Sequence, residues 1–237
     1  MPPTDRYSCF AELEQNEREG LDYRIVYRSG DSGILVMAPH GGNIEPGCSE
    51  IADAVAAGNH SFYALEGLKP RGNWDLHIAS TRFDEPVCMN ALRHARTALA
   101  IHGCRDAGGT IYVGGLHQVL RDKAAELLCR SGFAAGMRSD IQGRSGSNVC
   151  NRSAGGMGVQ IEIPFDLRCR MFRNLKLDGR RSTTELFVDF VSTLRSALCC
   201  ATPSVTFRES GFKPRDGCGP PVYSPGRNFS GRNPRGK

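Results

Sequence analysis

Short apolar runs alternate with amphipathic stretches through the first 200 residues, and this alternation limits the fold more than any other feature of the sequence. Apolar runs bounded by glycine are typical of buried strands, whereas apolar residues three or four positions apart indicate one face of a helix. We expect strands at residues 23–28, 34–40, 61–67, 76–80, 97–103, 110–115 and 158–164, and the continuous apolar runs at 97–103 and 110–115 indicate parallel strands. We expect helices at residues 48–58, 85–95, 116–132 and 182–198. Interleaved strands and helices predict an α/β fold in which helices sandwich an open, mostly parallel or mixed sheet.

The basic charge of the chain is concentrated at its C-terminal end. Residues 201–237 contain seven Lys or Arg against two acidic residues, which leaves 23 basic and 23 acidic residues in 1–200. The same 37 residues include six prolines and six glycines and have no periodic apolar pattern. We therefore expect one domain at 1–200 and a basic, disordered tail at 201–237. Only this tail could contact nucleic acid, and a solvated extension is the simpler interpretation.

The composition places few other limits on the class of protein. No segment approaches the roughly 20 apolar residues that a membrane span requires, and the polar, acidic N-terminal segment does not resemble a secretory signal. We expect a monomer in the cytoplasm. The ten cysteines are scattered without a CxxC pair, which favours reduced, buried thiols over a disulfide framework or a cysteine zinc site.

Polar residues occupy the ends of the apolar runs where an α/β protein binds its ligands. His40 ends the run 34–40, His102 lies at the end of 97–103, and Glu45 follows His40 across a Gly-Gly turn. Two histidines and one carboxylate are the ligand set of a hydrolytic zinc site, in which water takes the fourth position. Glu162, inside an apolar strand, could then be the general base. Ordinary alternatives remain, namely histidines hydrogen-bonded in loops, a turn that only reverses the chain, and a Glu162 paired with a structural arginine.

Further candidates surround this set. His77 could lie beside the metal or contact the substrate. Arg144, Asn151 and Arg152 belong to a Gly/Ser/Asn-rich stretch before the Glu162 strand, and Arg82 is a weaker candidate for the same rim. An arginine binds a carboxylate through two parallel hydrogen bonds, so these residues predict an anionic substrate.

The sequence resembles a known enzyme family in six blocks over about residues 20–200. These blocks are PHGGNIEPGCSEIA, LHIASTRFDEP, AIHG, VGG, NVCNR and GVQIEIP, in that order, and they resemble the poly-γ-glutamate hydrolases of phages and bacteria. The resemblance implies a fold similar to the zinc carboxypeptidases and one Zn²⁺ held by His40, Glu45 and His102. It also implies that Glu162 is the general base and that the substrate is an anionic γ-glutamyl polymer.

Two classes of function therefore remain to be compared. The first is a zinc-dependent hydrolase of γ-glutamyl amide bonds, with a zinc amidase of another N-acyl or peptide substrate as its nearest alternative. The second is a non-catalytic, replication-associated protein that binds nucleic acid through the tail. The complete set of His40, Glu45, His102 and Glu162 favours the enzyme, because a binding module does not need groups that activate water.

Overall fold

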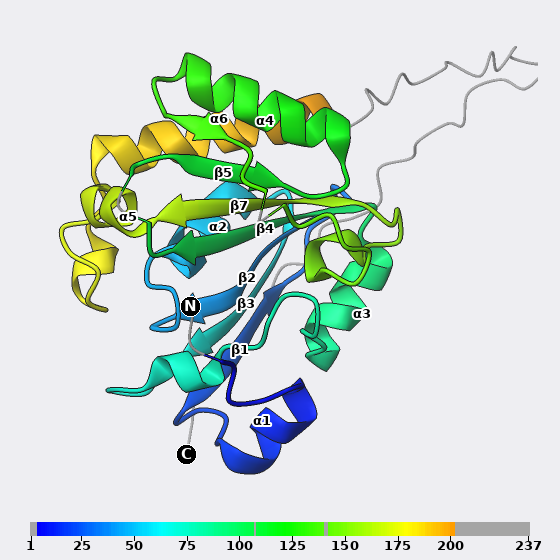
Figure 1. Cartoon of the computed structure of the whole chain (residues 1–237), viewed down its shortest axis with the longest axis vertical. Helices are drawn as coiled ribbons and strands as arrows, with labels where there is room; N and C mark the ends of the chain where they lie inside the picture. The colour runs from blue at the N-terminus through cyan, green and yellow to red at the C-terminus, as the bar shows by residue number, and fades with distance from the viewer. Residues whose placement is uncertain (1–3, 107, 140–141, 202–237) are drawn as a thin grey trace, which may run out of the picture. The chain divides into compact units, whose positions relative to one another are not determined.

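The computed structural model describes residues 4–106, 108–139 and 142–201, and it contains a seven-stranded mixed sheet with helices on both faces (Figure 1). The strands are β1 (Tyr23–Arg28), β2 (Ile34–Gly42), β3 (Ser61–Gly67), β4 (Thr97–Cys104), β5 (Ile111–Gly114), β6 (Ala135–Gly136) and β7 (Gly158–Pro164). The helices are α1 (Phe10–Asn16), α2 (Cys48–Ala56), α3 (Pro86–His94), α4 (Gln118–Arg130), α5 (Phe165–Met171) and α6 (Glu185–Ala201). This arrangement confirms the expected α/β fold.

The strand order is β1-β3-β2-β4-β7-β5-β6, and its four central strands are parallel. β1 runs antiparallel to β3, and β5 runs antiparallel to β7. The expectation of a parallel strand at 110–115 holds for its pairing with β6 but is wrong for its pairing with β7, so β5 runs opposite to the central strands. Only six residues separate β4 from β5, whereas a parallel connection needs a crossover of about a dozen residues or more.

The sheet carries a hydrophobic core on each face. Val36, Ile101 and Ile161 face one core, which α2, α4, α5 and α6 cover. Leu35 and Ala100, at alternate positions of the same strands, face a second core that contains residues of α1 and α3. Because side chains of a strand alternate between faces, β2, β3 and β4 contribute apolar residues to both cores, whereas β7 contributes apolar residues to the first core alone.

The strand expected at 76–80 was wrong. A 3-10 helix at Asn73–Leu76 occupies its start, and the following residues pair with no strand. Leu76 and Ile78 are nevertheless fully buried in the second core. Their alternation therefore reflects packing onto the sheet face rather than pairing within the sheet. The four expected helices are confirmed with shifted ends, whereas α1 and α5 were not expected.

No helix within the described ranges is both long and apolar enough to span a membrane. The chain divides into a unit of Met1–Pro203 and a second unit of Ser204–Lys237. All of the second unit lies outside the described residues, as does the predicted tail beyond residue 201. The expected disorder of that tail stays a prediction from composition.

We expect a chain truncated after Thr202 to keep the melting temperature and the activity of the full chain. The reason is that the removed segment has no periodic apolar pattern with which to add to either core. Thermal unfolding and activity of the two chains, side by side, test this. A drop of several degrees in the truncated chain would show that the tail packs on the domain.

Candidate metal centre

A β-bulge near the end of β2 determines which face of the sheet His40 occupies. Ala38 pairs with Ala64 of β3, but Gly41 pairs with Glu66, so β2 contains one extra residue between the two pairs. An extra residue reverses the alternation of side chains beyond it. His40 therefore leaves the face of Val36 and Ala38 and joins the opposite face, where its ring contacts those of His77 and Phe83.

The glycine turn after His40 folds the backbone back so that Glu45 returns to it. The Glu45 amide donates to the carbonyl oxygen of His40 at 3.0 Å. Gly42 has φ +61°, and a β-carbon there would lie 2.6 Å from the carbonyl oxygen of Gly67. The hydroxyl of Ser49 accepts the Gly42 amide hydrogen at 2.9 Å. Backbone conformation and space both require glycine at position 42.

Replacing Gly42 by Ala should lower the free energy of unfolding by roughly 2 kcal/mol or more, because the left-handed conformation and the clash with β3 both oppose a β-carbon. Thermal denaturation measures this as a fall of several degrees in melting temperature. Gly58→Ala is the matched control, since a β-carbon there meets nothing within 4 Å. Equal melting temperatures for the two variants would contradict the requirement at Gly42.

His40, Glu45 and His102 present their donor atoms to one point. The Nδ1 atom of His40 lies 3.2 Å from Oε1 of Glu45 and 3.3 Å from Nδ1 of His102. His102 Nδ1 lies 3.7 Å from the other Glu45 oxygen. Ligands of a tetrahedral zinc ion with bonds of about 2.0–2.2 Å stand roughly 3.3–3.6 Å apart. The spacing and the chemistry of these three donors fit one zinc ion.

The surrounding backbone orients these donors. Nε2 of His40 lies 2.8 Å from the carbonyl oxygen of Ile78, to which it donates, and Nδ1 is then left with its lone pair. The amide of Gly103 donates to Glu45 at 2.8 Å. Nε2 of His102 is buried without a hydrogen-bond partner among the described residues. Protein groups therefore satisfy His40 and Glu45 but leave one buried nitrogen of His102 without a partner in the described part of the chain.

The charges of the cluster also favour a cation. Burial by itself raises the pKa of the Glu45 carboxyl, but His40 and His102 offset this and hold that pKa well below its ordinary value. Burial by itself lowers the pKa of His102, yet hydrogen bonding to Glu45 and the charge of Glu162 raise it. Both shifts show that the buried carboxylates stabilise positive charge at this point.

Glu162 lies beside His102 because the two residues are register partners on the parallel strands β4 and β7. One of its oxygens accepts from the side-chain amide of Gln160 at 3.2 Å. Burial raises the pKa of the Glu162 carboxyl, since loss of water disfavours the charged form. Glu162 forms no ion pair with an arginine in the part of the chain that the structure describes, so the structural-arginine alternative finds no support there.

Arg168 of α5 is a buried cation that inspection of the sequence did not identify. The residue is 3% exposed, and its guanidinium donates to the carbonyl oxygens of Pro46, Cys104 and Ile163 at 2.6, 3.3 and 3.2 Å. It thereby connects the turn after His40 to the ends of β4 and β7. Its charge also lowers the pKa of Glu162, although burial has the larger, opposite effect.

His77 is the second histidine beside His40, with ring centroids 4.0 Å apart. His40, Glu45 and His77 each offer a ligand atom within 4.8 Å of one another, which is looser than the spacing that includes His102. Nδ1 of His77 binds Asp5 at 2.6 Å, a partner 72 positions away that no sequence pattern indicated. Burial and the charge of His40 lower the pKa of His77 to about 4, so its ring is neutral near pH 7.

The structure engages the other predicted substrate residues in protein contacts. Arg82 donates to Asp5 at 2.6 Å, next to His77. Arg152 donates to the carbonyl oxygen of Phe83 at 2.8 Å, and Arg144 approaches the sulfur of Met137 at 3.9 Å. The amide of Asn151 binds the backbone of Leu116, Gly143, Ser145 and Gly158. Contact of these residues with substrate stays a prediction. Asn151 is the weakest candidate, because its side-chain amide already hydrogen-bonds to four backbone groups.

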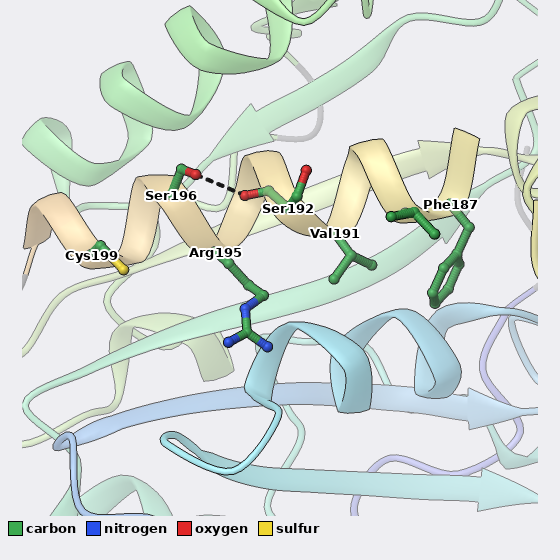
Figure 2. A pocket seen from close by; sticks show the side chains of 7 residues that line it. Phe187, Val191, Ser192, Arg195, Ser196 and Cys199 are labelled. Carbon is green, nitrogen blue, oxygen red and sulfur yellow. Dashed lines mark hydrogen bonds between the residues drawn. The ribbon is translucent and has the colours of Figure 1, made fainter. Parts of the chain in front are cut away.

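A groove of about 430 Å³ lies along α6 (Figure 2). Its lining is Phe187, Val188, Val191, Ser192, Arg195, Ser196 and Cys199. Figure 2 shows the side chain of Arg195 pointing toward α2, where it lies 3.5 Å from the carbonyl oxygen of Ala54. The lining contains no histidine or carboxylate, so the groove does not have the chemistry of the metal cluster.

Comparison with known proteins decides the family. A model of the poly-gamma-glutamate hydrolase family matches residues 7–193. The chain belongs to this family. Poly-gamma-glutamate hydrolases are hydrolytic enzymes, and this protein is therefore a hydrolytic enzyme with their zinc carboxypeptidase-like fold.

Relatives of this poly-gamma-glutamate hydrolase family member occur in Bacillus subtilis (strain 168). The SPbeta prophage-derived UPF0714 protein YoqZ is 37% identical over 194 residues, which cover 80% of this chain and 70% of YoqZ. The UPF0714 protein YndL is 36% identical over 194 residues, which cover 80% of this chain and 76% of YndL.

Two solved structures share the fold. A bacteriophage poly-gamma-glutamate hydrolase has a TM-score of 0.81 and 32% identity, with 84% of this chain and 98% of that chain covered. The zinc-free apo form of YndL has a TM-score of 0.80 and 35% identity, with 84% and 99% covered.

Proposed function

We propose that the protein is a zinc-dependent hydrolase that cleaves the γ-glutamyl amide bonds of poly-γ-glutamate or a similar anionic γ-linked polymer. The observation that carries this proposal is the convergence of donor atoms from His40, Glu45 and His102, 3.2–3.7 Å apart, beside Glu162. Membership of the poly-gamma-glutamate hydrolase family supports the substrate, and the zinc-free form of YndL supports the metal.

His40, Glu45 and His102 would hold one zinc ion. When bound there, zinc supplies Lewis acidity, which makes water more acidic and the amide carbonyl more electrophilic. The three residues are 1%, 5% and 2% exposed, so bulk water does little to screen their charges. Fixed groups in a dry site need little rearrangement as charge develops during reaction.

Glu162 moves the proton. Its carboxylate accepts a proton from the attacking water as the oxygen–carbon bond forms at the amide carbon. The raised pKa of Glu162 makes it a stronger base than an exposed carboxylate. The same carboxyl then donates the proton to the nitrogen as the carbon–nitrogen bond breaks, and Glu162 returns to its starting state. The Gln160 amide, 3.2 Å away, holds the carboxylate in position throughout.

A hydrolysis screen combined with metal analysis tests this function. The purified chain should contain about one zinc per molecule and should shorten γ-linked polyglutamate but not the α-linked polymer. Removal of zinc with a chelator should abolish the cleavage, and restored zinc should recover it. A chain that binds zinc but cleaves only small N-acyl or α-peptide substrates would overturn the γ-glutamyl specificity while keeping the zinc hydrolase.

A further inference from the structure

A continuous stack of side chains leads outward from the candidate metal centre. The ring of His40 contacts that of His77 at 4.0 Å between centroids. His77 stacks on Trp74 at 4.4 Å and an interplanar angle of 12°. The guanidinium of Arg105 lies over the indole of Trp74, 4.8 Å from its centroid. Added end to end, these three separations equal the length of about four extended peptide residues. A short stretch of a polymer therefore spans the distance from His40 to Arg105.

Arg105 ends this stack as an exposed cation. It follows β4 directly, three residues after His102. Its neighbour Asp106 forms an ion pair with Arg138, and Arg105 has no ion pair with a carboxylate among the described residues. Several other exposed arginines in this chain are paired with acids, as Arg28 is with Asp53 and Arg173 with Asp178. Arg105 is therefore held in place by an aromatic face while its hydrogen-bond donors stay available.

We propose that Arg105, seated on Trp74, is the residue that binds a carboxylate of the substrate near the scissile bond. This inference rests on the proposed function and assigns a specificity-determining residue to the same site. A γ-linked glutamyl chain has a free carboxylate on each residue, so one such group falls within reach of Arg105 while a neighbouring amide lies at the metal centre. The chemical class recognised is a polymer with closely spaced carboxylates, rather than a neutral peptide.

The geometry suits an arginine specifically. A guanidinium that lies flat on an indole uses its face for the ring and keeps its N–H donors around its edge. A carboxylate accepts two parallel hydrogen bonds from that edge. Lysine would keep the charge but lose the paired donors and the planar contact with Trp74. The side chain should therefore act on substrate binding rather than on bond cleavage.

Steady-state kinetics on γ-linked polyglutamate test the assignment. Arg105→Ala should raise KM roughly tenfold or more, the scale for a lost hydrogen bond between charged groups, with kcat within about twofold of wild type. Arg105→Lys should give an intermediate KM. Arg93→Ala is the matched control, because Arg93 is also exposed and its loss changes the net charge equally, but it lies on α3 and contacts Asn90. Arg93→Ala should keep both constants.

The fluorescence of Trp74 gives a second readout, because Trp74 is the only tryptophan in the chain. A short γ-glutamyl oligomer added to Glu162→Gln should change this fluorescence, and the change should require Arg105. A KM for Arg105→Ala equal to that of Arg93→Ala, or a fall in kcat alone, would overturn the assignment, as would loss of zinc or of melting temperature in Arg105→Ala. If the wild-type chain leaves the polymer intact, the proposed function fails, while the fluorescence titration still decides whether Arg105 binds it.

Discussion

We expect His102→Ala to lose bound zinc and hydrolytic activity together while the chain stays folded. The substitution removes one of three donors that lie 3.2–3.7 Å apart, and the two that remain cannot complete a tetrahedral site. Activity should fall to the background of the chelated protein. Zinc per chain from elemental analysis, with the rate on γ-linked polyglutamate, measures both effects. His40→Ala should behave in the same way.

His77 separates the two ligand sets that the geometry allows. We expect His77→Ala to keep its zinc, since its donor belongs only to the looser group that extends to 4.8 Å. His94→Ala is the matched control, because His94 is exposed on α3 and, within the described ranges, hydrogen-bonds only to the carbonyl oxygen of Asn90. Zinc retained in His102→Ala but lost in His77→Ala would replace His102 by His77 in the ligand set. Zinc retained in His40→Ala would refute the centre altogether.

Glu162→Gln should keep its zinc and lose turnover by roughly a hundred-fold or more, the scale of a general base. Glutamine has nearly the same shape as glutamate and can retain a hydrogen bond with Gln160, but it cannot accept the proton of water. Because Glu162 does not belong to the predicted ligand set, metal content and turnover should separate in this variant. This separation distinguishes a base from a ligand.

Glu66→Gln provides the control for Glu162→Gln. Glu66 is also 9% exposed, and it lies on β3, where it pairs with Arg24 rather than with the histidine cluster. Loss of that ion pair should lower the melting temperature modestly while turnover stays within a few-fold of wild type. Near-normal turnover in Glu162→Gln, or the same loss in both variants, would remove Glu162 from the role of base.

The order of strands and helices could largely be predicted from the sequence, because hydrophobic periodicity is a local property. The runs at 34–40, 97–103 and 158–164 became β2, β4 and β7. The prediction failed where a local pattern has more than one cause. Leu76 and Ile78 alternate like residues of a strand, yet they pack on the face of the sheet without pairing in it. The direction of β5 relative to β7 depended on the length of the connection from β4, which periodicity does not report.

The sequence by itself determined which side chains are available for chemistry and that they lie at, inside or just after apolar strands. His40, Glu45, His102 and Glu162 could be identified in this way, because parallel strands bring their carboxyl ends to one edge. Only the tertiary structure decided how they meet. The alternation along β2 would place His40 on the face of Val36 and Ala38, and the bulge before Gly41 turns it to the face of His102.

The groups that support this cluster depended on the tertiary structure even more. Asp5 meets His77 across 72 positions, and Arg168 binds three carbonyl oxygens of separate segments. Such contacts have no sequence signal, since their partners come together only when the sheet has formed. Hydrophobic periodicity therefore placed His40, His102 and Glu162 on their strands. Pairing register, a single extra residue in β2 and long-range hydrogen bonds decided the face, the spacing and the partners of the site residues.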